Sequence, residues 1–274
     1  NLNFGHLNIC SAASFQKQSL LHHVVTEFSL DILTLNETRI LADDPPAVKL
    51  GIAPSGYNSL HVARKPDAPH PRGGGLAIVF RSDLKITPHP LVTTLPEFTS
   101  FELQLVKVTS AAPSFTVANV YRPPSSSLSD FLDELDLFIS TMTPICGERL
   151  VICGDVNAPG SDSSSINADL ADVFAAHDLV QHVRDTTRES NILDVFVTGP
   201  RTSPSSVRVD DAGCVSDHRL VIASLPTRRQ PTASRPVRVT YRNIRQLDLT
   251  EFEGQLRASP LFTNPATTTD SFST

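Results

Sequence analysis

Two polar residues follow one of the most apolar segments of this chain. Residues 150–159, LVICGDVNAP, run from four apolar residues through a glycine to Asp155 and Asn157. Side chains alternate along a strand, so residues two positions apart project to the same side. A carboxylate and an amide that project together suggest a site, but Gly, Asp, Asn and Pro are also the usual turn residues. This stretch alone leaves both interpretations open.

Further polar residues stand at or near the ends of other apolar segments. They are Asn8 in HLNIC, Glu37 in TLNETR, Tyr121 and Arg122 in NVYRPP, Asp194 in ILDVF, and Ser216, Asp217 and His218 in CVSDHRLV. Taken singly, each has a structural alternative, such as a cap, a solvated side chain, a core ring or a turn. Asp194 is the hardest to explain in this way, because burying an unpaired carboxylate costs several kcal/mol. It therefore predicts a cation or a histidine beside it.

Together these residues contain the groups that phosphodiester hydrolysis requires. Hard cations such as Mg²⁺ prefer oxygen ligands, often one or two carboxylates with water and phosphate oxygens. The reaction needs a deprotonated water, neutralised phosphoryl charge and help for the leaving oxygen. A carboxylate with an amide, a second such pair, and an aspartate with a histidine could supply all three.

Apolar runs that alternate with helical patterns predict the elements that position these residues. We expect helices over 16–28, 129–142 (with Ser129 as N-cap) and 170–176, and a loop over 41–72 that contains a short strand at 57–62. The strands are expected over 2–9, 31–36, 76–80, 101–108, 115–121, 150–155, 192–198 and 220–225. Paired strands mixed with strands separated by helices favour an α/β sandwich with mixed sheets.

Composition limits the class of protein. The chain has 274 residues, a net charge of −6 and four cysteines without metal-site spacing, which indicates a reducing compartment. We expect no membrane span and see no targeting signal. The acidic balance disfavours a passive nucleic-acid binder. The segment 226–247, however, has no acid and six arginines, which could contact phosphate or belong to a solvated linker: Arg228, Arg229, Arg235, Arg238, Arg242 and Arg245.

In their order along residues 2–225, these motifs resemble the endonuclease/exonuclease/phosphatase superfamily. HLNIC, NVYRPP, GGGLAI and the later TYRNIR are more narrowly similar to the apurinic-type endonuclease domain of non-LTR (LINE-type) retrotransposons. The resemblance implies a four-layered α/β sandwich, in which two mixed β-sheets pack face to face with helices outside. It also implies an endonuclease-type domain over 1–225 and a basic linker and tail over 226–274, leading towards a downstream reverse transcriptase.

The resemblance also implies roles for individual residues. Mg²⁺, with Mn²⁺ as an alternative, would be bound by Glu37, Asn8 and Asp217, the last near the leaving group. Asp155 would activate the attacking water, and Asn157 would hold Asp155 and a phosphate oxygen. Asp194 would orient His218, which would contact the phosphoryl group, and Tyr121 would donate to phosphate. Further phosphate contacts are expected from Thr187 (or its neighbour Thr186), Ser216 and Arg122.

The implied activity is a Mg²⁺-dependent nick in double-stranded DNA that leaves a 3′-hydroxyl for target-primed reverse transcription, acting in the nucleus. The chain has no tryptophan, and Ala158 and Pro159 follow the GDVN motif, which favours the retrotransposon branch over abasic-site repair. An abasic-site enzyme or another phosphoesterase of the same fold remains an alternative. So does a catalytically inactive binding module.

Overall fold

The computed structural model describes residues 1–66, 73–146, 149–229 and 248–263 of the chain. The chain divides into two compact units, Asn1–Thr232 and Ala233–Thr274. The second unit contains α5 (Leu249–Ala258) and α6 (Pro260–Thr263). Four of the six arginines of the basic segment, from Arg235 to Arg245, lie outside the described residues. No helix in the described ranges combines the length and the apolarity that a membrane crossing requires.

The first unit contains two six-stranded mixed sheets. In spatial order, the first sheet consists of β12 (Ser206–Asp210), β13 (Leu220–Leu225), β1 (Leu2–Asn8), β2 (Ile32–Asn36), β4 (Leu76–Arg81) and β3 (Tyr57–Val62). The second consists of β10 (Val180–Gln181), β11 (Asp194–Thr198), β9 (Leu150–Asp155), β8 (Phe115–Tyr121), β6 (Glu102–Val108) and β5 (Ile86–Pro88). A separate two-stranded pair joins β14 (Arg228–Arg229) to β7 (Ala111–Ala112).

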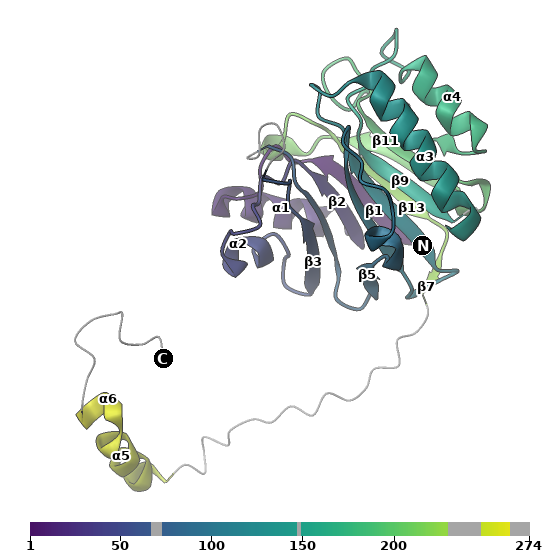
Figure 1. Ribbon diagram of the computed structural model, residues 1–274. Helices are drawn as coiled ribbons and strands as arrows, with labels where there is room; N and C mark the ends of the chain where they lie inside the picture. Colours follow the sequence, from purple (N-terminus) through teal and green to yellow (C-terminus); the bar gives the residue numbers. More distant parts are fainter. Residues whose placement is uncertain (67–72, 147–148, 230–247, 264–274) are drawn as a thin grey trace. The chain divides into compact units, whose positions relative to one another are not determined.

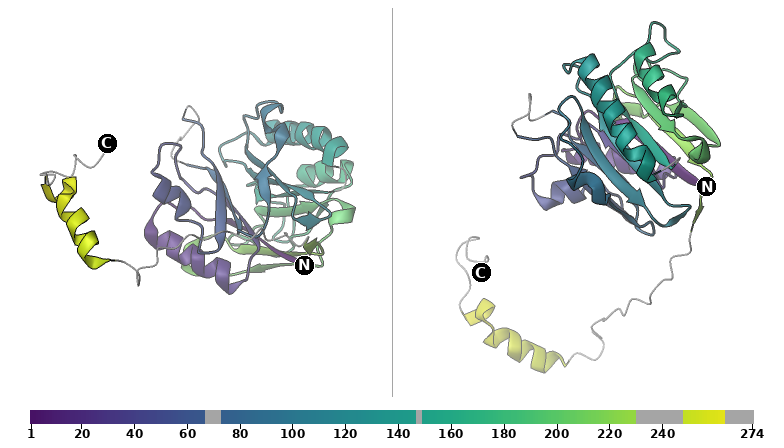
Figure 2. Two further views of the ribbon diagram at one scale, coloured as in Figure 1. Left: turned by 90° about the horizontal axis from the view of Figure 1, so that it is seen from below. Right: turned by 45° about the vertical axis from the view of Figure 1, so that its right-hand side comes forward.

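Helices cover the outer faces of both sheets. The helices of the first unit are α1 (Phe15–Glu27), α2 (Pro46–Leu50), α3 (Leu128–Cys146) and α4 (Ala168–Ala176), with 3₁₀ turns at Pro90–Thr93, Pro200–Thr202 and Gly213–Val215. Figure 1 shows α1 outside the sheet of β1 and β2, and α3 and α4 outside the sheet of β9 and β11. In Figure 2 both sheets stand between the purple α1 and the teal and green helices α3 and α4.

Three apolar clusters fill the spaces between these layers. The central cluster joins the facing sheet surfaces, and Phe4 on β1 meets Phe196 on β11 edge to face at 5.3 Å between ring centroids. A second cluster packs α3, through Phe131 and Phe138, against the second sheet, and a third packs α1 against the first. The predicted four-layered α/β sandwich is confirmed.

Most predicted elements are present, with several differences at their ends. The helix predicted from Ser129 begins earlier, because the Ser127 hydroxyl accepts the amide of Asp130 and caps it, and it continues to Cys146. The region predicted as loop contains α2, which begins after Pro45 with Pro46 in its first turn. The short strands β5, β10 and β12 were not predicted. They lie at sheet edges, where few buried side chains give a periodic pattern.

The topology brings one end of several strands together. In each sheet the central pair is parallel, β1 with β2 and β8 with β9, so their carboxyl ends lie at the same edge. The antiparallel neighbours β13 and β11 begin at that edge, and Asp194, the first residue of β11, pairs with Asp155, the last residue of β9. Carboxyl ends of parallel strands are the usual position of sites in open α/β sheets.

A buried amide network connects the two sheets below this edge. Asn36 Nδ2 on β2 donates to Asn119 Oδ1 on β8 (2.8 Å). Asn119 Nδ2 lies within 3.1–3.3 Å of the carbonyl oxygens of Leu35 and Ala77 and of Gln104 Oε1. Asn36 and Asn119 are both fully buried, so each polar atom needs its partner.

Replacing Asn119 with valine should therefore destabilise the fold. The change keeps a side chain of similar size but removes the partner of Asn36 Nδ2 and of Gln104 Oε1, both of which are buried. We expect a loss of about 2–4 kcal/mol in the free energy of unfolding, measured by urea denaturation. Asn58→Ala, at an exposed position of β3, is the control and should change it by less than about 0.5 kcal/mol. Equal effects of the two variants would contradict a connecting role for the network.

Candidate active site

A hydrogen-bonded group of side chains occupies the edge where these strands end. Asn8 Nδ2, at the end of β1, donates to Glu37 Oε1 (3.0 Å) and to Asp155 Oδ2 (2.8 Å). The Tyr121 hydroxyl, at the end of β8, donates to the same Glu37 oxygen (3.0 Å). The structure thus brings together four of the predicted site residues from four strand ends, two in each sheet.

Glu37 is held as an ionised carboxylate. Burial alone would raise the pKa of Glu37, but hydrogen bonds from Asn8, Arg39 and Tyr121 outweigh that effect and lower it. Arg39 Nη2 contacts the second oxygen, Oε2, at 3.0 Å. The backbone of Glu37 has φ +52°, in the left-handed region that L-residues seldom adopt. A strained backbone that presents a charged side chain is characteristic of functional sites.

Asp155 is the last residue of β9 in the second sheet, and Asn157 follows it. The sequence left open whether these two residues form a turn or a site, and the structure supports both interpretations. The Asn157 amide N–H donates to Asp155 Oδ1 (3.0 Å), and Asn157 Nδ2 donates to the carbonyl of Arg122 (2.9 Å). Asn157 has φ +47°, so it forms a turn, but the turn holds the Asp155 carboxylate towards Asn8. Burial and the nearby Asp194 carboxylate raise the pKa of Asp155 to about 7.

The glycine before Asp155 permits this arrangement. Gly154 has φ +153°, and a Cβ at this position would lie 1.8 Å from the carbonyl oxygen of Val120 on β8. Val120 is its direct partner in the parallel pair of β8 and β9. The glycine in CGD is therefore required for the close approach of two strands whose next residues, Tyr121 and Asp155, both reach the site.

We expect Gly154→Ala to destabilise the fold by roughly 3 kcal/mol or more, because backbone atoms of β8 must move to admit the methyl group. Gly56→Ala is the matched control, since Gly56 also has a positive φ (+83°) but a Cβ added there would have nothing within 4 Å. That control should cost only about 1 kcal/mol. Urea unfolding curves for the two variants would measure the difference, and similar costs would contradict the steric argument.

The buried carboxylate of Asp194 is paired with histidines, as its position in an apolar run predicts. Its Oδ2 accepts a hydrogen bond from His218 Nδ1 (2.8 Å). The other oxygen, Oδ1, lies 3.2 Å from His6 Nε2. All three side chains are almost completely buried. His218 Nε2 then faces Asp155 Oδ2 at 3.8 Å, a separation longer than a hydrogen bond.

The surrounding carboxylates keep His218 protonated at neutral pH. Burial lowers the pKa of this imidazole, but Asp194, Asp155 and Asp217 outweigh it and raise the pKa to about 9. The pKa of Asp194 is lowered: burial opposes ionisation, but His218 and His6 stabilise the carboxylate more strongly. The site thus presents an imidazolium beside Asp155, a carboxylate whose pKa lies near neutrality, which is a pattern typical of acid–base sites.

The residues at Glu37 fit a hard divalent cation. One amide nitrogen, that of Asn8, bridges oxygens of Glu37 and Asp155, so two carboxylates face a single polar group in a mostly buried place. Burial, followed by the nearby Asp194 carboxylate, raises the pKa of Asp155, so a cation beside it would favour its ionised form. A second candidate group within the described residues is Asp155, Asp194 and His218, whose ligand atoms lie within 4.8 Å of one another. Because both oxygens of Asp194 already accept from histidines, we expect the ion at Glu37.

Millimolar Mg²⁺ should raise the melting temperature of the wild type by about 2–8 °C, since an ion that binds only the folded state stabilises it. Glu37→Gln removes the charged ligand, and the shift should be lost. Glu27→Gln, at a half-exposed carboxylate near the end of α1, is the control and should keep the full shift. A shift that survives Glu37→Gln would place the ion elsewhere, with Asp155, Asp194 and His218 as the first alternative.

Four other predicted residues form hydrogen bonds or ion pairs with other groups of the protein, and their expected contacts with phosphate or metal stay predictions. Thr187 is fully buried, and its hydroxyl accepts the amides of Leu193 and Asp194 (3.0 and 3.1 Å). The Ser216 hydroxyl donates to the Asn8 carbonyl and accepts the amide of His218 (3.0 Å). Both residues therefore support the backbone around Asp194 and His218, and a phosphate contact for either stays a prediction.

Arg122 and Asp217 are engaged with other groups of the protein. The buried Arg122 guanidinium donates to the carbonyls of Val156 and Asn157 (3.3 and 2.9 Å), so it supports the turn that contains Asn157. Asp217 is exposed and forms an ion pair with Arg188 (2.7 Å). It lies near enough to His218 to raise the pKa of that imidazole, but it is not part of the buried hydrogen-bonded group.

The sequence analysis missed the residues that support the site from below. His6 holds Asp194 from the first sheet, and the Thr34 hydroxyl contacts the other ring nitrogen of His6. Asn36 Oδ1 accepts the backbone amide of Asp155 (2.7 Å). Each is a polar residue inside a strand pattern that is otherwise apolar, which was the available signal. This signal indicates that such a residue needs a polar partner, but it does not identify the partner, because the sequence does not show which strand of the opposite sheet lies against it.

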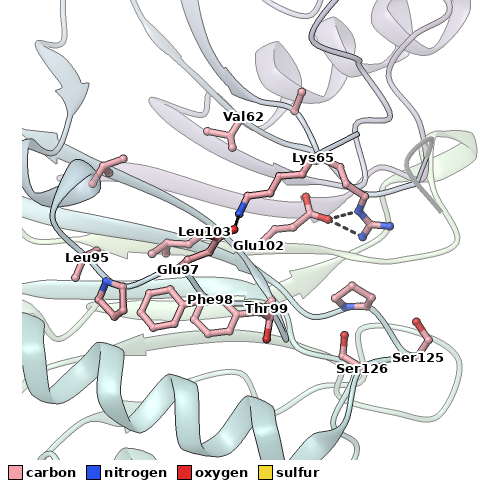
Figure 3. Close-up of a pocket in the computed structure, with 16 residues that line it drawn as sticks. Val62, Lys65, Leu95, Glu97, Phe98, Thr99, Glu102, Leu103, Ser125 and Ser126 are labelled. Carbon is pink, nitrogen blue, oxygen red and sulfur yellow. Dashed lines mark hydrogen bonds and ion pairs between the residues drawn. The ribbon is translucent and has the colours of Figure 1, made fainter. Parts of the chain in front are cut away.

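A cavity of about 450 Å³ lies beside the site, and Figure 3 shows its lining. Leu95, Phe98 and Leu103 give it apolar walls, and Lys65 and Glu97, which form an ion pair, also line it. It adjoins the site through Arg64, whose guanidinium contacts Glu102 and lies 5.6 Å from the centroid of the Tyr121 ring.

Comparisons with known proteins agree with this geometry. Residues 115–222 match a family model described as endonuclease-reverse transcriptase. This segment contains Tyr121, Asp155, Asn157, Asp194 and His218, whereas Asn8 and Glu37 precede it. No curated protein sequence matches the chain.

Several solved structures share the fold at low sequence identity. The endonuclease domain of TRAS1, a telomere-specific non-LTR retrotransposon, superposes with a TM-score of 0.62 and 16% identity, covering 82% of this chain and 97% of that one. The 3′ phosphatase NExo from Neisseria, bound to product DNA hairpin, gives 0.62 and 18%, over 82% and 99%. The AP endonuclease LMAP from Leishmania major gives 0.61 and 15%, over 84% and 88%. These likenesses establish the fold that carries the site.

Proposed function

We propose that this chain, which belongs to the endonuclease/exonuclease/phosphatase superfamily, is a Mg²⁺-dependent DNA endonuclease that nicks one strand and leaves a 3′-hydroxyl. The observation that carries the proposal is the placement of Asp155 Oδ2, which lies 3.8 Å from His218 Nε2 and 2.8 Å from Asn8 Nδ2, the same nitrogen that donates to Glu37. A general base, a cationic group for the phosphoryl oxygens and a metal-binding carboxylate thus meet at one sheet edge.

The residues of the chain suit the successive events of hydrolysis. Asp155 accepts a proton from the attacking water, and its pKa near neutrality matches that task. The water oxygen forms a bond to phosphorus as the bond to the 3′-oxygen breaks. The departing 3′-oxygen takes a proton from solvent water, which yields a 5′-phosphate and a 3′-hydroxyl. His218 donates through Nε2 to a phosphoryl oxygen that gains charge, and Asp194 holds its Nδ1 proton. Asn157 and Tyr121 orient the phosphate.

Glu37 would hold a divalent cation, which would supply neutralisation of the negative charge that develops during hydrolysis. The chain's part in this is to keep Glu37 ionised and fixed, through Asn8, Arg39 and Tyr121. Mn²⁺ has similar ligand preferences and is expected to substitute for Mg²⁺.

Two observations favour a role in retrotransposition over abasic-site repair. The matched family model is named for endonucleases joined to reverse transcriptases. The chain has no tryptophan that could line a pocket for a flipped sugar. We therefore propose double-stranded DNA in the nucleus as the substrate, with the 3′-hydroxyl as primer, residues 1–225 as the endonuclease domain and residues 226–274 as a basic linker towards a downstream reverse transcriptase.

The first test is conversion of supercoiled plasmid to open circle, with Mg²⁺ and with EDTA. We expect metal-dependent nicking that falls by about 10²–10⁴-fold in His218→Ala, because the group that stabilises the phosphoryl charge is removed. His177→Ala is the matched control, since His177 lies at the end of α4 and pairs with Asp136 of α3. This variant should nick DNA like the wild type. Nicking that survives His218→Ala would show that the chemistry lies elsewhere.

An abasic oligonucleotide distinguishes the main alternative. We expect cleavage of intact duplex at a rate similar to that of the abasic duplex, since the proposed function requires no missing base. Cleavage of the abasic strand faster by about 100-fold or more would identify a repair enzyme instead. Absence of cleavage of both, in a folded protein with Mg²⁺, would favour an inactive binding module.

A further inference from the structure

A second histidine binds the buried Asp194 carboxylate from the side away from the site. His6 lies on β1, two residues before Asn8, and is fully buried. Its Nε2 lies 3.2 Å from Asp194 Oδ1, and its Nδ1 lies 3.0 Å from the Thr34 hydroxyl on β2. No step of the proposed mechanism uses this imidazole. Its hydrogen bonds go to Thr34 and Asp194, and neither goes to Glu37, Asp155 or His218.

The two oxygens of Asp194 have separate partners. Oδ2 accepts from His218 Nδ1, and Oδ1 accepts from His6 Nε2. A carboxylate held at one oxygen can still rotate about its Cβ–Cγ bond, whereas one held at both has a fixed plane. Because a carboxylate is only an acceptor, both imidazoles must donate, so His6 carries its proton on Nε2.

The support extends further into the first sheet. The Thr34 hydroxyl on β2 contacts His6 Nδ1 at 3.0 Å, and Thr34 is fully buried. His6 therefore has a partner at each ring nitrogen and cannot turn without breaking one. Since Asp194 belongs to the second sheet and His6 to the first, this hydrogen bond also fixes the depth of Asp194 between the sheets.

We propose that His6 is a positioning residue for phosphodiester hydrolysis, an inference that rests on the proposed function. By holding Asp194 Oδ1, His6 fixes the carboxylate plane in which His218 Nδ1 is bound. His218 Nε2 is then kept directed at the reacting phosphate, beside Asp155. Outer partners of this kind commonly change activity by about 10–100-fold when they are removed.

Three variants separate positioning from packing. His6→Leu fills the space without a donor, and His6→Gln keeps an N–H that can reach Asp194. Phe4→Leu is the matched control. Phe4 lies two residues before His6 on the same strand and therefore on the same face. It is fully buried and contacts Phe196, which belongs to the strand that carries Asp194. This variant should lower the melting temperature but leave kcat within about twofold, because it removes only core packing.

In plasmid nicking, we expect His6→Leu to lower kcat by about 10–100-fold with KM changed less than about threefold. His6→Gln should recover most of the lost kcat. In an Asp194→Asn background, His6→Leu should cause little further loss, because the path from His6 to His218 is already broken. A kcat for His6→Leu within twofold of the wild type, or losses from the two substitutions that multiply independently, would overturn the proposal.

Nuclear magnetic resonance of the metal-free protein tests the same claim without catalysis. The Nδ1 proton of His218, bonded to Asp194, should shift or exchange faster in His6→Leu and remain near its wild-type position in His6→Gln and Phe4→Leu. An unchanged signal in His6→Leu would overturn the proposal. A wild type that fails to nick DNA, with the signal still dependent on His6, would refute the proposed function and leave the positioning role established.

Discussion

The structure depends on the placement of ionised groups in a gap between two sheets. Asp155 is the last residue of β9, and Asp194 is the first residue of the adjacent strand β11. Both carboxyl groups are almost completely buried, and a buried carboxylate without partners would cost several kcal/mol of stability. The partners come from the opposite sheet: Asn8 for Asp155, His6 for Asp194, and His218 between the two. Face-to-face packing of the sheets is therefore required by the site as much as by the apolar core.

The same constraint explains the amide network and the unusual backbone conformations. Asn36, Asn119 and Gln104 fix the separation and register of the sheets just below the site, where apolar contacts alone would allow sliding. Glu37 and Asn157 take left-handed conformations just after β2 and β9. The Glu37 carboxylate there meets Asn8 and Tyr121, and the Asn157 side chain binds the carbonyl of Arg122. Stability is thus given up at a few positions so that charged groups meet in a mostly buried place, which is a common feature of active sites.

The sequence predicted much of the fold and the residues at the centre of the site. Strand patterns with apolar alternation and the helix at 129–142 were strong enough to be recognised, and polar residues at strand ends identified Asn8, Glu37, Tyr121, Asp155 and Asp194. What could not be predicted depends on contacts across the two sheets. The second partner of Asp194, the hydrogen bonds of Thr187 and Arg122 within the protein, and the ion pair of Asp217 with Arg188 all follow from the way strands face one another.

The most direct measurement is the location of a bound ion and a phosphate in crystals of the protein with Mn²⁺ and a short DNA duplex, from the anomalous scattering of manganese. The account predicts manganese against Glu37, with the scissile phosphate between that ion and His218 Nε2, and with Asp194 still bound by both histidines. Manganese on Asp194, or a phosphate remote from His218, would contradict it.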